Sequence, residues 1–241
     1  MPSLTDRPDD PAVAKLYEAI GDLVVFAVNS NKEFLRWGVV EIVLMSEELS
    51  AIVQKLKNSD PEIRENALDK IGTLKPSNAL DIIQHFLSDA DPEVRGTAAC
   101  NLGEIRDRRA VPYLINVARV DSTEEVRADA LLALAEYRSS EILNCLVDEV
   151  YREKRSRRPR QEVARQLKHY DTESSVDALI ILLQDEDVYV RIPTVDSLKE
   201  LNRPRLREVW EKAMDDESYY VTEIAREALA HLDSFVSTKP I

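Results

Sequence analysis

Apolar residues recur along the chain with the spacing of an amphipathic helix. In the best-patterned stretch, Val94, Ala98 and Leu102 follow one another at intervals of four residues, with mostly polar or small residues between them. Positions four apart lie on one face of an α-helix, so these side chains predict a buried stripe. Arg95 directly follows Val94 and gives a fixed point for comparing this stretch with others.

The same pattern recurs at steps of 28 to 33 residues. In each copy an aliphatic residue stands seven positions after the arginine, and in nearly all copies an apolar residue stands directly before it. A period between about 20 and 50 residues is typical of an array of structural repeats. We call these places the anchor positions; they are Arg36, Arg64, Arg95, Arg127, Arg160, Arg191 and, with threonine instead of arginine, Thr222.

A helix-start signal stands four residues before all anchor positions except the first. A short side chain with an oxygen atom there accepts hydrogen bonds from the free N–H groups of the first helical turn. In two copies a proline follows, Pro61 or Pro92, where a missing N–H does no harm. The predicted caps are Asp60, Asp91, Thr123, Ser156, Asp187 and Ser218. We therefore expect an anchor helix to begin after each of them.

A second segment with helical periodicity precedes each anchor helix. These segments are residues 49–57, 79–87, 110–118, 141–150, 175–183 and 206–214, and a more apolar hairpin is predicted in residues 12–45. One helical hairpin cannot bury its apolar faces alone, whereas stacked hairpins share a continuous core. The sequence thus predicts an all-α fold, a right-handed α-solenoid (superhelix) of about seven helical hairpins.

Three phrases carry a resemblance to a known family. They are Asp-Pro-Glu-Val-Arg at residues 91–95, Asn-Leu-Gly-Glu-Ile-Arg-Asp-Arg-Arg-Ala-Val-Pro-Tyr-Leu-Ile at 101–115, and Glu-Glu-Val-Arg-Ala-Asp-Ala-Leu-Leu-Ala-Leu at 124–134. They resemble HEAT repeats, and more narrowly the HEAT-like repeats named after phycobilisome (bilin) lyase subunits. The resemblance is strong over residues 49–138, fair over 174–232 and weak before 48. It implies a fold and not an activity.

We divide the chain into a mobile leader, residues 1–10, one solenoid, residues 11–233, and a flexible tail, residues 234–241. Within the solenoid, residues 11–46 are predicted to be an atypical N-terminal capping hairpin and 47–233 the HEAT-like repeats, because terminal repeats depart from the consensus. Trp37 lies in the capping hairpin. It either packs on the next repeat or is an exposed anchor for a partner, since aromatic residues are favoured at binding hot spots.

The resemblance also implies a structural role for the anchor arginines. In HEAT repeats such an arginine commonly bonds an aspartate of an adjacent unit. The expected ladder consists of Arg64, Arg95, Arg127 and Arg191 with Asp60, Asp91 and Asp187.

The composition limits which cellular compartment and which class of partner we expect. No apolar run approaches the length of about 18 residues that a membrane span needs, and the acidic first ten residues lack the apolar core of a signal peptide. We therefore expect a cytoplasmic protein. Cys100 and Cys145 are too few for a disulfide framework or a zinc cluster. The net charge of −13 argues against nucleic acid, whose binding rests on phosphate neutralisation.

One segment reverses the charge of the chain. Residues 151–168 contain 8 basic and 2 acidic residues, whereas the rest of the chain contains 24 basic and 43 acidic residues. Arginine forks bind carboxylate and phosphate bidentately, so a patch here could take phosphate, the propionates of a tetrapyrrole or an acidic protein face. The alternative is a solvated loop that pairs with the chain's own acids. The predicted patch is Arg152, Lys154, Arg155, Arg157, Arg158 and Arg160.

If the anchor helices line the inner face, as they do in HEAT arrays, the polar residues between their buried positions face a partner there. The candidates for partner binding, besides Trp37, are Glu41, Glu65, Asp69, Asn101 and Asp129. This set is mostly acidic and implies a partner with a basic or hydrogen-bonding surface.

No catalytic residue, metal site or cofactor is predicted. His85, His169 and His231 lie in different repeats, and the chain has no glycine-rich phosphate loop, nucleophile elbow or spaced metal motif. We expect a non-catalytic scaffold or adaptor that binds another protein, as a monomer or heterodimer, for example in the assembly of an iron–sulfur or chromophore protein. The alternative is a subunit of a bilin lyase, or a phycobilisome degradation factor, that binds a tetrapyrrole or a phycobiliprotein.

Overall fold

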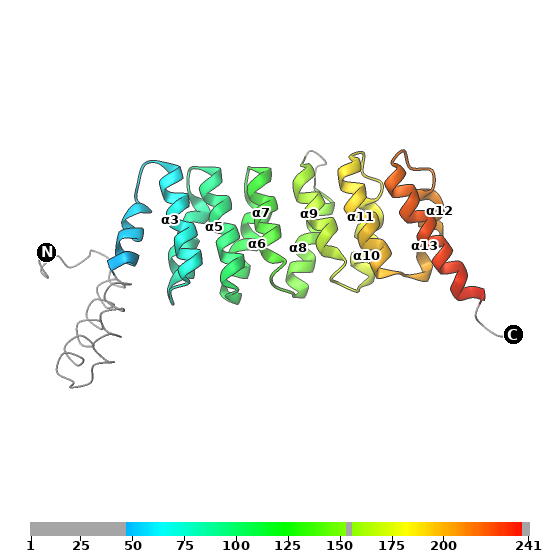
Figure 1. The fold of residues 1–241 in the computed structure, drawn as a ribbon, viewed down its shortest axis with the longest axis horizontal. Coiled ribbons are helices and arrows are strands. Elements are labelled where there is room, and N and C mark those ends of the chain that lie inside the picture. Colours follow the sequence, from blue (N-terminus) through cyan, green and yellow to red (C-terminus); the bar gives the residue numbers. More distant parts are fainter. Residues whose placement is uncertain (1–46, 153–155, 238–241) are drawn as a thin grey trace, which may run out of the picture. The chain divides into compact units, whose positions relative to one another are not determined.

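The computed structural model describes residues 47–152 and 156–237, and the regular structure in these ranges is helical (Figure 1). Met1–Ala67 and Leu68–Ile241 form two compact units. The predicted leader, the hairpin at residues 12–45 with Trp37 and Glu41, and residues 153–155 and 238–241 lie outside the described residues.

In the first unit, residues 47–55 are helical and a short loop leads to the start of α3 (Pro61–Leu74). Asp60 begins this helix as predicted, because its Oδ1 accepts the N–H of Glu62 at 3.1 Å. The guanidinium of Arg64 reaches back to the same loop and donates from Nη1 to the carbonyls of Asn58 (2.9 Å) and Ser59 (3.1 Å). The arginine therefore holds the entry to its own helix.

The second unit consists of successive helical hairpins. In each hairpin a first helix packs against the anchor helix that follows it, and consecutive anchor helices pack side by side in chain order (Figure 1). The pairs are α4 (Ala79–Ile83) and η1 (Gln84–Ser88) with α5 (Pro92–Ile105), η2 (Arg108–Ala110) and α6 (Val111–Val120) with α7 (Glu124–Leu134), α8 (Ser140–Val150) with α9 (Arg157–Leu167), α10 (Glu173–Leu182) with α11 (Val188–Leu201), and η3 (Pro204–Leu206) and α12 (Arg207–Ala213) with α13 (Tyr219–Ser237). The predicted solenoid of helical hairpins is confirmed.

The apolar stripe of the anchor helices forms the core. Val94, Ala98 and Leu102 on α5 are fully buried. Of their equivalents on the later anchor helices, Leu229 on α13 is half-buried. The other equivalents that are buried include Val126, Ala130, Leu134, Val163, Leu167, Val190, Thr194, Leu198, Val221 and Ala225. The one polar member, Thr194, donates its hydroxyl to the carbonyl of Val190 at 2.7 Å, so its burial leaves no donor unsatisfied.

Small residues let the anchor helices approach closely. At Gly103 on α5, an added Cβ would lie 2.9 Å from the Cα of Ala133 on α7. Such a contact is shorter than real Cβ atoms tolerate, so only glycine fits at this crossing. The two helices are therefore in contact through backbone, and the packing continues along the anchor side of the unit.

Two sequence predictions need adjustment. The tail was predicted to begin at residue 234, but α13 extends to Ser237. Thr123 and Ser156 stand at the predicted cap positions of α7 and α9, yet neither side chain accepts a capping hydrogen bond. Asp91 and Asp187 do cap, by accepting the N–H groups of Glu93 and Tyr189 at 2.9 Å each.

No helix in the described part of the chain is both long and apolar enough to cross a lipid bilayer.

Candidate functional site

The anchor arginines join consecutive hairpins. Arg95 donates from Nε (2.8 Å) and Nη2 (3.0 Å) to the two carboxylate oxygens of Asp121, which lies in the loop of the next hairpin. Its Nη1 donates to the carbonyl of Asp89 in its own loop at 2.9 Å. One guanidinium thus ties two successive loops together, through the bidentate geometry that suits arginine and carboxylate.

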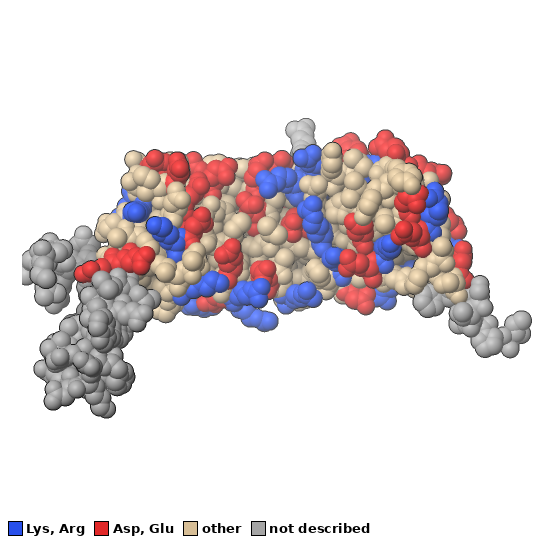
Figure 2. Space-filling view, viewed as in Figure 1, with Lys and Arg blue, Asp and Glu red and all other residues tan. Residues whose placement is uncertain are grey.

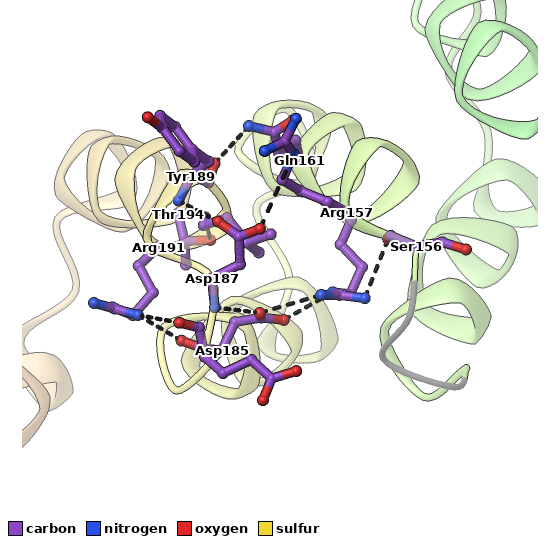
Figure 3. Close-up of polar contacts among 11 residues, drawn as sticks. Ser156, Arg157, Gln161, Asp185, Asp187, Tyr189, Arg191 and Thr194 are labelled. Carbon is purple, nitrogen blue, oxygen red and sulfur yellow. Dashed lines mark hydrogen bonds and ion pairs between the residues drawn. The ribbon is translucent and has the colours of Figure 1, made fainter. Parts of the chain in front are cut away.

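Two more joints have the same construction. Arg160 pairs with Asp185, and Arg191 pairs with Asp216, each with an Nε distance of 2.8 Å. Figure 3 shows Arg191 reaching back to the loop that contains Asp185. Asp187 was predicted to be a ladder member, but its side chain caps α11. The guanidinium of Arg160 forms its ion pair with Asp185 instead. Asp91 likewise serves as the cap of α5.

The aspartates that pair with the anchor arginines lie two residues before the cap positions, and their carboxylates also accept a backbone N–H there. Asp121, Asp185 and Asp216 accept the N–H of Thr123 (2.9 Å), Asp187 (3.0 Å) and Ser218 (2.8 Å). Burial opposes ionisation of Asp121, but the hydrogen bonds from Arg95 and from the Thr123 N–H outweigh it and lower the pKa of this carboxyl. The charged form of the aspartate therefore fixes the start of the next anchor helix.

The joint between α7 and α9 departs from this construction. Arg127 is only 6% exposed; its Nη1 donates to the carbonyl of Asp121 (3.0 Å) and its Nη2 to Oγ of Ser156 (2.6 Å). Its Nε is buried and has no hydrogen-bond partner in the described structure. The residue two before the cap Ser156 is Lys154, where the neighbouring loops have aspartate. Among the described residues, no carboxylate pairs with Arg127 in the way that Asp121 pairs with Arg95.

The predicted basic patch contains residues of quite different kinds. Arg160 is wrongly placed in it, because this side chain is 4% exposed and paired with Asp185. Arg152 is half-buried and contacts the carboxylate of Glu149 (2.7 Å) and the carbonyl of Arg119 (2.7 Å). Lys154 and Arg155 lie outside the described residues.

Arg157 and Arg158, at the start of α9, are the exposed members of the patch. Arg157 lies 4.0 Å from Asp187 and stacks over the ring of Tyr189, with its Cζ 5.3 Å from the ring centroid. Gln161 donates to the carbonyl of Tyr189 at 2.8 Å and joins α9 to α11 at this point (Figure 3). Figure 2 shows basic side chains beside the start of α9, between acidic groups near the starts of α7 and α11.

The predicted partner-binding residues are also divided by the structure. The prediction that Asn101 is exposed is wrong, because this residue is only 5% exposed. Its side-chain Nδ2 donates to the carboxylate of Asp69 (3.1 Å) and to the carbonyl of Thr97 (3.0 Å). Asp69 is exposed and Glu65 is half-buried. Asp129 is half-buried, and burial raises its pKa, which Arg158 opposes and Glu93 and Glu125 reinforce.

An exposed row of side chains crosses the anchor helices, and of its members only Arg158, in the predicted basic patch, received a role from the sequence. It occupies the position two before each anchor and consists of Glu93, Glu125, Arg158, Tyr189 and Tyr220, on α5, α7, α9, α11 and α13. We call it the exposed row. Tyr189 is 57% and Tyr220 45% exposed, and the neighbouring Tyr219 is 76% exposed. The fixed offset from the anchor was the signal that could have revealed it.

The cysteines are not activated. Burial is the main cause that raises the pKa of Cys100 and of Cys145 to about 11. Both side chains are therefore thiols at neutral pH, which are poor nucleophiles and poor metal ligands. Among the described residues, no group of His, Cys, Asp and Glu could hold a metal ion.

A cavity of about 490 Å³ lies on the side of the first helices, between η1 and α6. Gln84, His85, Tyr113 and Asn116 are among the residues that line it. None of these residues belongs to the exposed row, so the cavity offers a second surface against which binding at the row can be compared.

Comparison with solved structures places the fold among helical-repeat proteins. The Escherichia coli protein YibA is 15% identical, with a TM-score of 0.60 over 98% of this chain and 94% of its own. The complex of CpcE and CpcF of phycocyanin lyase from Nostoc sp. PCC7120 is 21% identical, with a TM-score of 0.55 over 76% of each chain. An engineered protein is 20% identical, with a TM-score of 0.54 over 78% of this chain and 97% of its own. At these identities the likeness concerns the fold alone.

No curated protein matches the sequence. The family model for HEAT repeats matches residues 49–135 and 142–230. These two matches cover most of the chain and coincide with the stacked hairpins and their arginine ladder. The chain therefore belongs to the HEAT-repeat family.

Proposed function

We propose that the chain is a non-catalytic scaffold that binds another protein along the exposed row. The observation that carries this proposal is the exposure of Tyr189, Tyr219 and Tyr220 on neighbouring anchor helices. Tyrosine and arginine are enriched among the residues that dominate binding energy at protein interfaces. Large aromatic side chains on successive repeats give an extended contact surface, which is how stacked-repeat proteins bind their partners.

The charges of the row define the chemistry of the partner. Glu93 and Glu125, with the half-buried Asp129 nearby, make the α5–α7 part acidic, whereas Arg157 and Arg158 make the α9 part basic. Complementary charges orient two proteins and suppress wrong registers. The partner should therefore present basic groups to α5 and α7, and acidic groups beside an apolar patch to α9, α11 and α13.

Affinity capture from the native host tests this proposal. The immobilised wild-type chain should recover one dominant partner, and the double variant Tyr189→Ala/Tyr220→Ala should recover far less of it. Tyr113→Ala is the matched control, because Tyr113 is 44% exposed and lines the separate cavity beside α6. Equal recovery by all three proteins, or loss only with Tyr113→Ala, would overturn the proposal.

A finer role follows from the identity of that partner. Recovery of a cofactor-containing protein would support a function in its assembly or maturation. The tetrapyrrole alternative is a separate prediction, tested by incubating the chain with phycocyanobilin. A shift of the pigment's absorbance at micromolar concentration would support it, and an unchanged spectrum would remove it.

A further inference from the structure

The first helix of the α5 hairpin changes its winding halfway. α4 ends at Ile83, and the chain continues as the 3₁₀-helix η1 over five residues, Gln84–Ser88. In the described part of the chain the other 3₁₀ segments, η2 and η3, have three residues each and precede α6 and α12. A 3₁₀ run longer than about four residues is uncommon, and one within a helix often marks a functional site or strain. The hairpin therefore departs from the repeat at η1.

The cavity of about 490 Å³ lies between η1 and α6 and is lined by regular helices. Side chains three residues apart in a 3₁₀-helix lie directly above one another, so η1 lines the cavity with two columns. These columns are Gln84 with Leu87 and His85 with Ser88. The lining residues of α6 are spaced by three and four and therefore share one face of that helix; they are Tyr113, Asn116 and Val117. Four of the five side chains of η1 and one face of α6 thus form a single site.

The lining combines an apolar base with uncharged polar groups. Leu87 and Val117 are buried, whereas the exposed lining residues are His85, Ser88, Tyr113 and Asn116. The lining contains no Lys, Arg, Asp or Glu. Arg109 lies within electrostatic reach of Tyr113, but its charge is paired with Asp107 at 2.6 Å. A charged ligand would lose its water here without gaining a counter-charge, so the cavity suits a neutral molecule.

Gln84 lacks a hydrogen bond that a ligand in the cavity can supply. Its Oε1 is buried and has no hydrogen-bond partner in the described structure. A buried acceptor without a donor is costly. The terminal torsion of a glutamine is broad and roughly two-fold, so the carboxamide of Gln84 can turn towards a donor placed in the cavity. The matching ligand therefore carries an N–H donor.

We propose that this cavity binds the adenine base of a free nucleoside. A glutamine or asparagine carboxamide pairs bidentately with adenine, because its oxygen accepts from the N6 amino group while its nitrogen donates to N7. Gln84 supplies this pair of groups, and its Oε1 gains the donor that it lacks. The ring of Tyr113, which is 44% exposed, stacks on the face of the base. The cavity also lies within the range of about 300–1,000 Å³ that small-molecule sites have.

The uncharged lining selects the nucleoside over its phosphorylated forms. No basic side chain lines the cavity to pair with a phosphate, and the net charge of the chain is −13. Binding of nucleic acid strands depends on neutralising their phosphates. Adenosine therefore fits this site better than AMP or an adenine strand does.

Titration calorimetry of the full chain with adenosine tests the site. Adenosine should bind saturably, and inosine, which has a carbonyl in place of the N6 amino group, should bind at least about tenfold more weakly. Amide resonances of η1 and α6 should shift with adenosine, whereas those of α11 should not. Absence of saturable adenosine binding at millimolar concentration, equal binding of inosine, or shifts confined to other helices would overturn the proposal. Tighter binding of AMP or of a short oligoadenylate would contradict the neutral ligand.

Two variants separate the site from unspecific stacking. Gln84→Leu keeps the approximate size of the side chain but removes the carboxamide, and it should weaken adenosine binding by about tenfold without lowering the melting temperature. Tyr113→Ala should weaken it by a similar factor through the lost stacking. Tyr189→Ala is the matched control on the exposed row and should bind adenosine as the wild type does. Wild-type affinity in both cavity variants, or a loss in Tyr189→Ala, would contradict the assignment. These outcomes are independent of partner capture, so they leave the proposed function untouched.

Discussion

At the scale of single residues, the same amino acid has different roles according to its loop. Arg95 and Asp121 are 13% and 7% exposed and share two hydrogen bonds, whereas Arg109 and Asp107 form a similar pair that is 63% and 27% exposed. Solvent screens the attraction between Arg109 and Asp107. These two residues also lie in the same loop, so their pair does not connect two hairpins. The first pair connects two hairpins, so its loss should affect the whole fold.

Asp121→Asn should therefore lower the free energy of unfolding by about 3–5 kcal/mol, because it leaves the guanidinium of Arg95 buried without its counter-charge. Asp107→Asn should cost less than about 1 kcal/mol. Urea denaturation of the two variants measures the difference. Similar losses in both variants would show that the ladder pair is no more important than a surface pair.

The same pair predicts the effect of acid. The pKa of Asp121 is lowered below its ordinary value of 3.8 in the folded chain. A depressed folded pKa contributes stability above the unfolded value, and this contribution disappears as the pH falls through the folded pKa. The wild-type chain should therefore lose stability below about pH 4 more steeply than Asp121→Asn. Parallel pH profiles of the two proteins would contradict this assignment.

The contribution of Asp129 to stability should change with pH in the opposite direction to that of Asp121. Burial raises its pKa, so the charged form is disfavoured in the folded chain at neutral pH. A raised folded pKa of an acid means that stability increases as the pH falls through it. Asp129→Asn should thus stabilise the chain at pH 7, with the gain shrinking towards low pH, as thermal melts across this range would show. A destabilised variant at pH 7 would mean that Asp129 has a partner that favours its charge.

At the scale of helices, the local sequence pattern predicted where the helices begin and which of their faces are buried. The caps Asp91 and Asp187, the proline start of α5 and the buried stripe of Val94, Ala98 and Leu102 depend on neighbours in sequence, and the structure contains all of them. Asn101 was misjudged because its burial depends on a different helix. Gly72 on α3 leaves the space that the Asn101 side chain fills, since an added Cβ there would collide with it. The periodicity of one helix does not contain that information.

The buried stripe has a direct test on α5. Val94 is fully buried, so Val94→Asp would place an unpaired carboxylate in the core and should cost at least about 3 kcal/mol. Glu93→Asp, one residue away on the exposed row, should stay within about 0.5 kcal/mol. An unchanged melting curve for Val94→Asp would show that the core face is assigned wrongly.

Contact between neighbouring anchor helices is tested at Gly103. A valine there would meet the backbone of Ala133 and force α5 and α7 apart, at a cost of about 1–3 kcal/mol. Glu104→Ala, on the exposed side of the same turn, is the control and should change the free energy of unfolding by less than about 0.5 kcal/mol. Equal stability of Gly103→Val and wild type would contradict the close approach.

At the scale of the whole molecule, residues that recur in every hairpin build the fold, so residues that depart from the repeat are the candidates for function. The loop before α9 has lysine where the loops before α7, α11 and α13 have aspartate, and its first turn carries Arg157 and Arg158. The sequence placed Arg160 both at an anchor position and in the basic patch, so it did not decide between the ladder and the surface. The packing of α9 against α11 decides it, because Arg160 pairs with Asp185 whereas Arg158 is exposed.

Charge reversal separates these two classes. Arg157→Glu/Arg158→Glu should leave the free energy of unfolding within about 1 kcal/mol, because both side chains are exposed. Arg160→Glu should cost at least about 3 kcal/mol, because it sets two buried carboxylates against each other at Asp185. Calorimetric melts compare the two, and collapse of the surface double variant would mean that the start of α9 is an internal clamp.

The central claim is that the exposed row binds a protein partner, and the most direct measurement is the affinity of the captured partner for the wild-type chain and for Tyr189→Ala by titration calorimetry. Exposed aromatic residues that act as hot spots cost more than about 1–2 kcal/mol when truncated. The dissociation constant should therefore rise by at least about tenfold in Tyr189→Ala and stay unchanged in Tyr113→Ala. Equal affinities for wild type and Tyr189→Ala would contradict the claim.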